Sequence, residues 1–171
     1  MANEEPARPG TVLALKRPPV RQSVMVRSNR PHTFDTFVNT LGAWWPMNPF
    51  SSGKDRVRTV TFERRVGGRI YETWEDRTEA DWGEVLAWEP PARFVMSWTM
   101  TPVPTEIELT FTELGPELTR VAVEHRGWER MTQEQIDRDC VLPGGGYLGG
   151  SYDKGWALIL GRFATAMGGQ P

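Results

Sequence analysis

Two ionisable side chains are candidates for acid–base chemistry inside the fold. Glu72 follows Ile70 on one side of a predicted strand, and His125 follows Val121 on one side of another. Alternation turns both toward the core, where each needs a hydrogen-bond partner. In a pocket, Glu72 would accept a hydrogen bond from a ligand and His125 would donate or shuttle a proton. In a filled core, neighbouring hydroxyls, tryptophan N–H groups or water would satisfy both, and the sequence leaves the two alternatives open.

The chain also carries eight tryptophans in 171 residues, more than a core of this size requires. Tryptophan is large, rarely fully buried and suited to holding flat molecules. We therefore predict a small hydrophobic or aromatic ligand as the partner. The residues expected to contact it are Glu72, Trp74, Met96, Trp98, His125, Trp128, Trp45, Tyr152 and Trp156. Two of these have a structural alternative, because Trp45 either closes the mouth of a pocket or plugs a core, and Tyr152 either touches ligand or only supports the fold.

The sequence contains no other complete catalytic motif. The glycines of residues 144–149 have the spacing of a dinucleotide loop, but no βαβ strand precedes them, so they indicate a hinge. Ser151 lacks the glycine two places later that a nucleophile elbow needs. The single cysteine, Cys140, has no partner for a disulfide, and His32 and His125 offer no standard zinc spacing. We predict neither a metal nor a cofactor.

Charge and hydropathy exclude further classes. The chain has 20 basic and 22 acidic side chains and a formal net charge of -2, which argues against a nucleic-acid partner. No apolar run approaches the roughly 18 residues of a membrane span, and residues 1–19 lack the apolar centre of a signal peptide. We expect a cytoplasmic protein without a membrane span, as a monomer or a homodimer. Residues 1–19 are expected to form a disordered tail before one domain over residues 20–168.

The elements that position these residues follow from periodicity. Alternation predicts a strand from Val20, and Pro31 then begins a short amphipathic helix that ends near Gly42. Residues 43–50 contain two prolines, which should keep them out of regular structure, and aromatic side chains, which should fold them onto an apolar surface. Residues 57–128 read as six extended segments separated by turn residues, which predicts an antiparallel meander. Alternation leaves the inward face of the segment around Val85 and Leu86 undecided.

Two helices are predicted at the C-terminal end. Residues 131–140 begin with Thr132 and Gln135 at capping-box spacing, which indicates a short helix and a candidate lid. A glycine-rich hinge over residues 143–146 follows. One helix then explains an apolar stripe at spacings of three and four, which Gly168 and Gly169 end. Its members are Leu148, Tyr152, Trp156, Ile159, Phe163 and Met167. The glycines within this helix indicate close packing against a neighbour.

The order strand, helix, six strands and long helix predicts an α+β helix-grip fold. A seven-stranded, curved antiparallel sheet would wrap around the C-terminal helix, because its apolar face must be covered and that helix is long enough. The stretches 66–72 and 82–93 resemble the core signature of the activator of heat-shock protein 90 ATPase homologues, within the START-like (SRPBCC, Bet v-like) superfamily. Residues 124–128 and 152–156 are similar to bacterial members, so the resemblance spans about residues 20–167.

This resemblance implies the helix-grip fold but admits three functions. The first is binding of a small hydrophobic or aromatic molecule, without chemistry, in a cavity between sheet and helix. The second is an acid–base enzyme of the polyketide cyclase or dehydratase type, in which Glu72 and His125 would be catalytic. The third is a chaperone-interaction module, which would need an apolar patch on the outer sheet face, where the sequence places mainly polar side chains. The sequence favours binding over catalysis.

Overall fold

The computed structural model describes residues 17–139 and 151–168. One seven-stranded antiparallel sheet has the strand order β1-β7-β6-β5-β4-β3-β2. The strands are β1 (Val20–Val26), β2 (Val57–Phe62), β3 (Arg69–Trp74), β4 (Glu79–Glu89), β5 (Arg93–Trp98), β6 (Thr105–Gly115) and β7 (Leu118–Arg126). Strands β2 to β7 form the predicted meander, and β1 pairs with β7.

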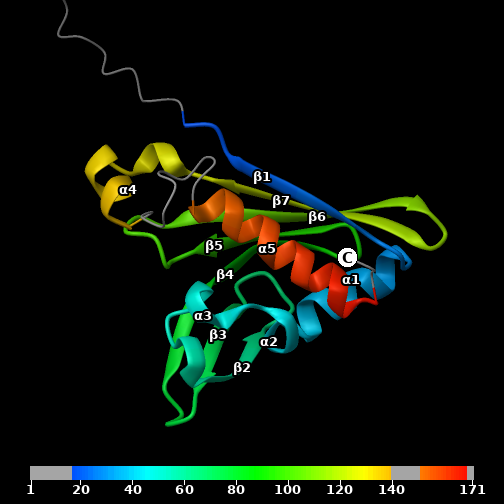
Figure 1. The fold of residues 1–171 in the computed structure, drawn as a ribbon, viewed down its shortest axis with the longest axis horizontal. Coiled ribbons are helices and arrows are strands. Elements are labelled where there is room, and N and C mark those ends of the chain that lie inside the picture. The colour runs from blue at the N-terminus through cyan, green and yellow to red at the C-terminus, as the bar shows by residue number, and fades with distance from the viewer. Residues whose placement is uncertain (1–16, 140–150, 169–171) are drawn as a thin grey trace, which may run out of the picture.

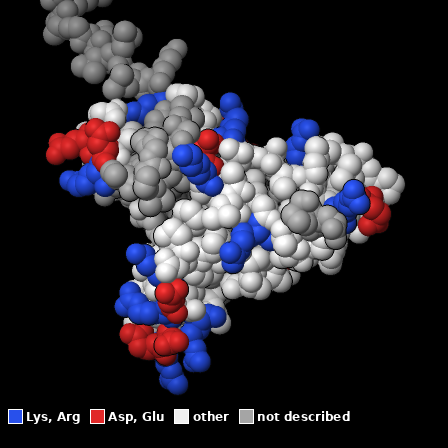
Figure 2. Space-filling view, in the orientation of Figure 1, with Lys and Arg blue, Asp and Glu red and all other residues white. Residues whose placement is uncertain are grey.

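Helices accompany this sheet and confirm the predicted helix-grip arrangement. They are α1 (Arg30–Asn39), α2 (Leu41–Trp44), α3 (Met47–Phe50), α4 (Gln133–Asp139) and α5 (Ser151–Ala166), with the short 3-10 turns η1 (Lys54–Arg56) and η2 (Trp128–Arg130). Figure 1 shows α5 lying along one face of the curled sheet, with α1 beside its C-terminal end. Figure 2 shows a cluster of acidic and basic side chains at the end of the molecule that carries β2 and β3.

Side-chain caps explain where two of the helices begin. The side chain of Asn29 accepts a hydrogen bond from the backbone N–H of His32, at 2.9 Å, at the N-terminus of α1. At α4, Thr132 and Gln135 cap each other's backbone N–H groups at 2.9 and 3.1 Å, which confirms the predicted capping box. The predicted hinge over residues 143–146 and the first member of the stripe, Leu148, lie outside the described residues.

The N-terminal tail predicted over residues 1–19 also falls mainly outside the described part of the chain. Its last residues can be placed, because residues 17–19 precede β1. The guanidinium of Arg17 donates hydrogen bonds to the backbone carbonyls of Trp128, at 2.9 Å, and of Met131. The segment just before β1 is thus tied to the turn that follows β7.

Residues 43–50 differ from the expectation of irregular structure, because they contribute to the two single-turn helices α2 and α3. Pro46 separates the two helices, whereas Pro49 lies within α3, where the preceding residue Asn48 has non-helical backbone angles, with φ −105° and ψ 112°. Pro46 disfavours helical backbone at the preceding residue, and Trp45 is accordingly extended, with φ −63° and ψ 130°. The expected burial of this aromatic segment is confirmed, since Trp44 and Trp45 are 4% and 6% exposed.

A β-bulge decides the inward face of β4, which alternation left open. Ile70 pairs with Gly83 and Tyr71 pairs with Asp81, so Trp82 is an extra residue on β4. The bulge shifts the phase of alternation, and Trp82 and Val85, three positions apart, are both buried. A side chain at Gly83 would place its Cβ 1.7 Å from the carbonyl oxygen of Ser97, so the close approach of β5 requires glycine there.

The inner faces of β5, β6 and β7 form the core together with α1 and α5, as the alternation predicts. The side chains predicted to face inward from these strands that are buried are Phe94, Met96, Trp98, Ile107, Leu109, Phe111, Val121, Val123 and His125. From α5, the stripe members Trp156, Ile159 and Phe163 are buried against them. The glycines of α5 differ from one another: a Cβ at Gly155 would lie 3.0 Å from the ring of Phe50, whereas Gly161 has no neighbour within 4 Å.

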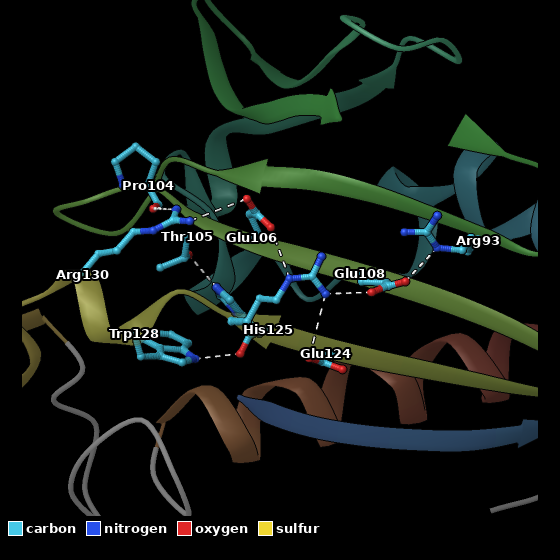
Figure 3. Close-up of polar contacts among 10 residues, drawn as sticks. Arg93, Pro104, Thr105, Glu106, Glu108, Glu124, His125, Trp128 and Arg130 are labelled. Carbon is cyan, nitrogen blue, oxygen red and sulfur yellow. Dashed lines mark hydrogen bonds and ion pairs between the residues drawn. The ribbon is translucent and has the colours of Figure 1, made fainter. Parts of the chain in front are cut away.

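The outer face of the sheet carries a ladder of ion pairs (Figure 3). Glu108 lies directly opposite Glu124 in the β6–β7 pairing, which alone would be repulsive. Arg126 contacts Glu108 at 2.7 Å and Arg93 contacts it at 2.8 Å. Hydrogen bonding to Arg126, and then to Arg93, lowers the pKa of the Glu108 carboxyl. An interaction module would need an apolar patch on this face, and β5 to β7 present ion pairs there instead.

Candidate ligand-binding site

Glu72 points inward as predicted, and its carboxylate is occupied by protein donors. The side chain is fully buried. Its Oε1 accepts hydrogen bonds from the backbone N–H of Gly53 at 2.5 Å and from Trp74 Nε1 at 2.7 Å, and its Oε2 accepts one from Trp82 Nε1 at 2.6 Å. Hydrogen bonds to an ionised acceptor are stronger than neutral ones. Glu72 therefore anchors the segment before η1 and Trp82 of β4 to β3, and it fixes the ring of Trp74 at the end of β3.

Trp74 is held in place from several directions, which makes it part of this anchor. Its indole N–H is bound by Glu72, and the guanidinium of Arg56 lies 4.1 Å from the centroid of its ring. The missing side chain of Gly53 leaves room for the ring, because a Cβ there would lie 2.2 Å from Trp74 Nε1. The packing of Trp74 accounts for its half-buried position without a ligand.

His125 lies at the centre of a buried hydrogen-bond chain. Trp156 Nε1 donates to His125 Nδ1 at 3.1 Å, so the imidazole proton is assigned to Nε2. His125 Nε2 in turn donates to Thr105 Oγ1 at 2.7 Å, a contact visible in Figure 3. Thr105 Oγ1 lies 3.3 Å from Thr101 Oγ1, which donates to the carbonyl of Val103 at 2.8 Å. The chain joins β7, β6 and α5.

The surroundings of His125 make its ring a weak base. It is fully buried, and burial lowers the pKa of His125 from 6.5 to about 3. Aromatic rings lie around the imidazole, with centroids 4.5 Å away for Trp128, 5.2 Å for Tyr152, 6.1 Å for Trp156 and 6.2 Å for Trp98. His125 is therefore neutral near pH 7 and acts as a cross-link between the last strand and α5.

An apolar cavity lies between the inner face of the sheet and α5, and its lining is entirely hydrophobic. It is formed by Phe37, Leu41, Trp45, Phe62, Ile70, Trp82, Phe94, Met96, Trp98, Ile107, Leu109 and Trp156. The centre of a water molecule can move within about 10 Å³ of it, which is room for about one water. The sequence led us to expect a larger space, and the tryptophans of the lining fill it.

Trp45 occupies the middle of this tryptophan cluster. Its ring centroid lies 4.7 Å from that of Trp82, 5.7 Å from that of Trp156 and 6.3 Å from that of Trp98. Its Nε1 donates to the carbonyl of Phe50 at 2.9 Å. In this closed state Trp45 plugs the core and does not close the mouth of a pocket.

The structure brings together part of the predicted ligand-binding set. Trp45, Met96, Trp98 and Trp156 line the cavity. The remaining members lie outside its lining, in the Glu72 anchor or around the His125 ring: Glu72, Trp74, His125, Trp128 and Tyr152. Sequence reasoning missed Trp82, whose inward direction depends on the bulge, and Gly83 beside it was the available signal.

One polar atom in this region has no partner. Trp98 is 7% exposed and lines the cavity. Within residues 17–139 and 151–168, its Nε1 is the one buried side-chain nitrogen or oxygen without a hydrogen bond. The same described residues contain no group of three or more side chains placed to hold a metal ion. None of the helices described is both long and apolar enough to cross a membrane.

A curled antiparallel sheet that holds a C-terminal helix over an apolar cavity defines a START-like helix-grip protein. The chain belongs to the family described as activator of Hsp90 ATPase homolog 1-like protein, whose model matches residues 34–168. A search of curated proteins gave no match.

Solved structures with the same fold include two at 29% identity. One is an anthrahydroquino-γ-pyrone synthase solved as a complex, with a TM-score of 0.54 over 88% of this chain and 97% of that one. The other is the self-sacrificing resistance protein CalC from Micromonospora echinospora, with a TM-score of 0.58 over 88% of this chain and 94% of that one. An Aha1 dimer from Colwellia psychrerythraea, at 14% identity, shares the fold, with a TM-score of 0.58 over 87% of this chain and 95% of that one.

Proposed function

We propose that the protein binds a small hydrophobic or aromatic molecule between the inner face of its sheet and α5. The observation that carries the proposal is the cavity there, whose lining side chains are all aliphatic, aromatic or methionine. Such walls favour flat apolar molecules, because binding buries nonpolar surface and stacks aromatic rings.

A ligand must displace protein side chains, since the closed cavity has room for only about one water. Trp45 is the side chain best placed to move, because it belongs to the connection between α2 and α3 and not to the sheet. Its indole N–H is bound to the carbonyl of Phe50, in α3 itself, so ring and helix can shift together. In the bound state, Trp45 withdraws from the cluster and the ligand stacks against Trp82 and Trp156.

One structural neighbour at 29% identity supports a ligand of this kind. It is named for the synthesis of an anthrahydroquino-γ-pyrone, and its structure is that of a complex. The fused-ring system in that name has the flat, apolar shape that the tryptophan-lined cavity suits. We carry over the shape of the ligand and not its identity.

Acid–base catalysis is the second candidate, because that neighbour is a synthase. Glu72 and His125 would have to perform it, and each is engaged by protein groups. The low pKa of His125, about 3, gives it little capacity to take up a proton near neutral pH. If the protein catalyses a reaction through these residues, Glu72→Gln or His125→Ala will abolish turnover while ligand affinity stays within a few-fold of the wild type.

The binding proposal is tested by thermal unfolding with a panel of neutral aromatic compounds of two to four rings. A ligand that binds the folded state alone raises Tm with concentration, by a free energy that follows mass action. We expect at least one member of the panel to raise Tm and to quench tryptophan fluorescence. If no compound does either, the binding proposal is rejected.

A pair of matched variants locates the site. Leu109→Ala removes a side chain from the cavity lining and should increase the affinity for the panel. Leu160→Ala removes the same side chain from a buried position outside the lining and should not. Equal affinities in the two variants would place the ligand elsewhere on the protein.

A further inference from the structure

The indole N–H of Trp98 stands apart from those of the other tryptophans that line the cavity. Trp45 donates to Phe50, Trp82 donates to Glu72 and Trp156 donates to His125. Trp98 Nε1 is also buried and has no acceptor among the described residues. A buried donor without a partner is destabilising, because it has lost its hydrogen bonds to water and gained nothing in return.

Neither packing nor a trapped water explains the unpaired donor. The ring centroid of Trp98 lies 5.9 Å from that of Trp82 and 6.3 Å from that of Trp45. Phenylalanine at position 98 would keep these ring contacts without burying an N–H. A buried water is held by two to four polar partners. The rest of the lining is apolar and its other indole N–H groups are already bound, so a water beside Trp98 would find one partner.

We propose that Trp98 is a specificity-determining residue, whose Nε1–H donates a hydrogen bond to an oxygen of the bound ligand. This inference rests on the binding function proposed above and adds the chemistry that the site selects. One hydrogen-bond donor in an apolar cavity discriminates strongly, because a ligand without a matching acceptor leaves the donor unpaired.

The lining also defines the charge of that ligand. The cavity has no lysine, arginine or histidine among its lining residues, so a carboxylate or phosphate would enter without a compensating cation. A neutral acceptor such as a carbonyl oxygen can accept this hydrogen bond, and it loses much less hydration free energy on entering the cavity than an anion does. The ligand class that fits both the aromatic walls and the Trp98 donor is the neutral aromatic ketones and quinones.

Two probes of nearly equal size test the proposal, the ketone 1-tetralone and its hydrocarbon analogue tetralin. Affinities are measured by NMR titration for the wild type, for Trp98→Phe and for Trp88→Phe. Trp88 serves as the matched control, because it is partly buried beside the core but does not line the cavity. We expect Trp98→Phe to weaken 1-tetralone by about tenfold and to leave tetralin within about twofold, whereas Trp88→Phe should change the ratio of the two affinities little.

The outcomes separate this proposal from the binding function. If both probes bind and Trp98→Phe leaves their affinity ratio unchanged, Trp98 is not the selecting donor, although the cavity remains a binding site. If neither probe binds the wild type, the assignment of aromatic ketones as the ligand class fails, and the panel of aromatic compounds described above decides the binding function separately. If Trp98→Phe folds poorly, NMR on the wild type still tests the proposal. The resonance of the Trp98 indole N–H proton should shift downfield when 1-tetralone binds and should not when tetralin binds. An unmoved resonance in the presence of bound ketone would overturn the proposal.

Discussion

Trp156 Nε1 lies 3.1 Å from His125 Nδ1, so a hydrogen bond between two buried rings joins α5 to β7. This bond requires a neutral imidazole with a free lone pair on Nδ1. Protonation of His125 would replace an acceptor by a donor facing a donor. The cross-link between helix and sheet is therefore sensitive to pH, and the sensitivity can be measured.

The first prediction concerns acid stability. The pKa of His125 is about 3 in the folded protein, against an ordinary value of 6.5. Between these values the unfolded chain binds a proton that the folded protein does not, so stability falls as the pH decreases from about 6.5 toward 3. Between pH 7 and pH 5, urea unfolding should show the wild type losing about 2 kcal/mol more than His125→Gln. Identical losses in the two proteins would contradict the assignment of a neutral, buried imidazole.

The second prediction concerns the Glu72 anchor. Glu72→Gln replaces one acceptor oxygen by an amide group that faces N–H donors, from either Trp82 or the pair of Gly53 and Trp74. We expect a loss of about 3 kcal/mol in the free energy of unfolding, because charge-assisted bonds are lost and a buried donor is left unpaired. Glu113→Gln, on an exposed part of β6, is the control and should change stability by less than about 0.5 kcal/mol. Equal stabilities of the two variants would show that the anchor is not formed.

The third prediction contrasts two glycines. Gly161 is in the interior of α5 with no neighbour within 4 Å, so Gly161→Ala should stabilise the protein by about 1 kcal/mol through helix propensity. Gly83→Ala should destabilise it, because the new Cβ would lie 1.7 Å from the Ser97 carbonyl oxygen and force β4 and β5 apart. Thermal unfolding measures both. A neutral Gly83→Ala would mean that the Ser97 carbonyl of β5 does not approach Gly83 this closely.

The fourth prediction concerns the outer ion ladder. Removing the cation in Arg126→Gln should raise the pKa of the Glu108 carboxyl toward its usual value, because Arg126 is the main cause of its lowering. An NMR titration of the side-chain carboxyl measures this directly. Arg58→Gln, on an exposed part of β2, should leave the Glu108 titration unchanged. A Glu108 pKa that is the same in all three proteins would rule out the ladder in solution.

Much of the fold could be predicted from the sequence, because it depends on patterns of two and of three to four residues. Alternation placed Glu72 and His125 on the inner face, and both are fully buried. The stripe from Leu148 to Met167 predicted α5, of which Ser151–Ala166 is described, and the pair Thr132 and Gln135 predicted the start of α4. These features are local, so neighbouring residues suffice to specify them.

The parts that the sequence did not show depend on contacts between distant residues. Trp82 faces inward because a bulge opposite Ile70 shifts the phase of β4, and alternation within one strand does not contain that information. The sequence indicated that Glu72 needed a partner, but the partners come from β3, β4 and the segment before η1. Room for a ligand is likewise a property of packing: the same tryptophans that suggested a pocket fill it in the closed state.

The central claim, that the cavity under α5 opens to admit an aromatic molecule, is tested most directly by NMR on methyl-labelled protein with bound 1-tetralone. The account predicts intermolecular nuclear Overhauser effects from the ligand to the methyl groups of Met96, Ile107 and Leu109, which line the cavity. Met25 and Leu114, which are 50% and 44% exposed, should show none. Contacts confined to such exposed methyl groups, with the three cavity residues silent, would contradict the account.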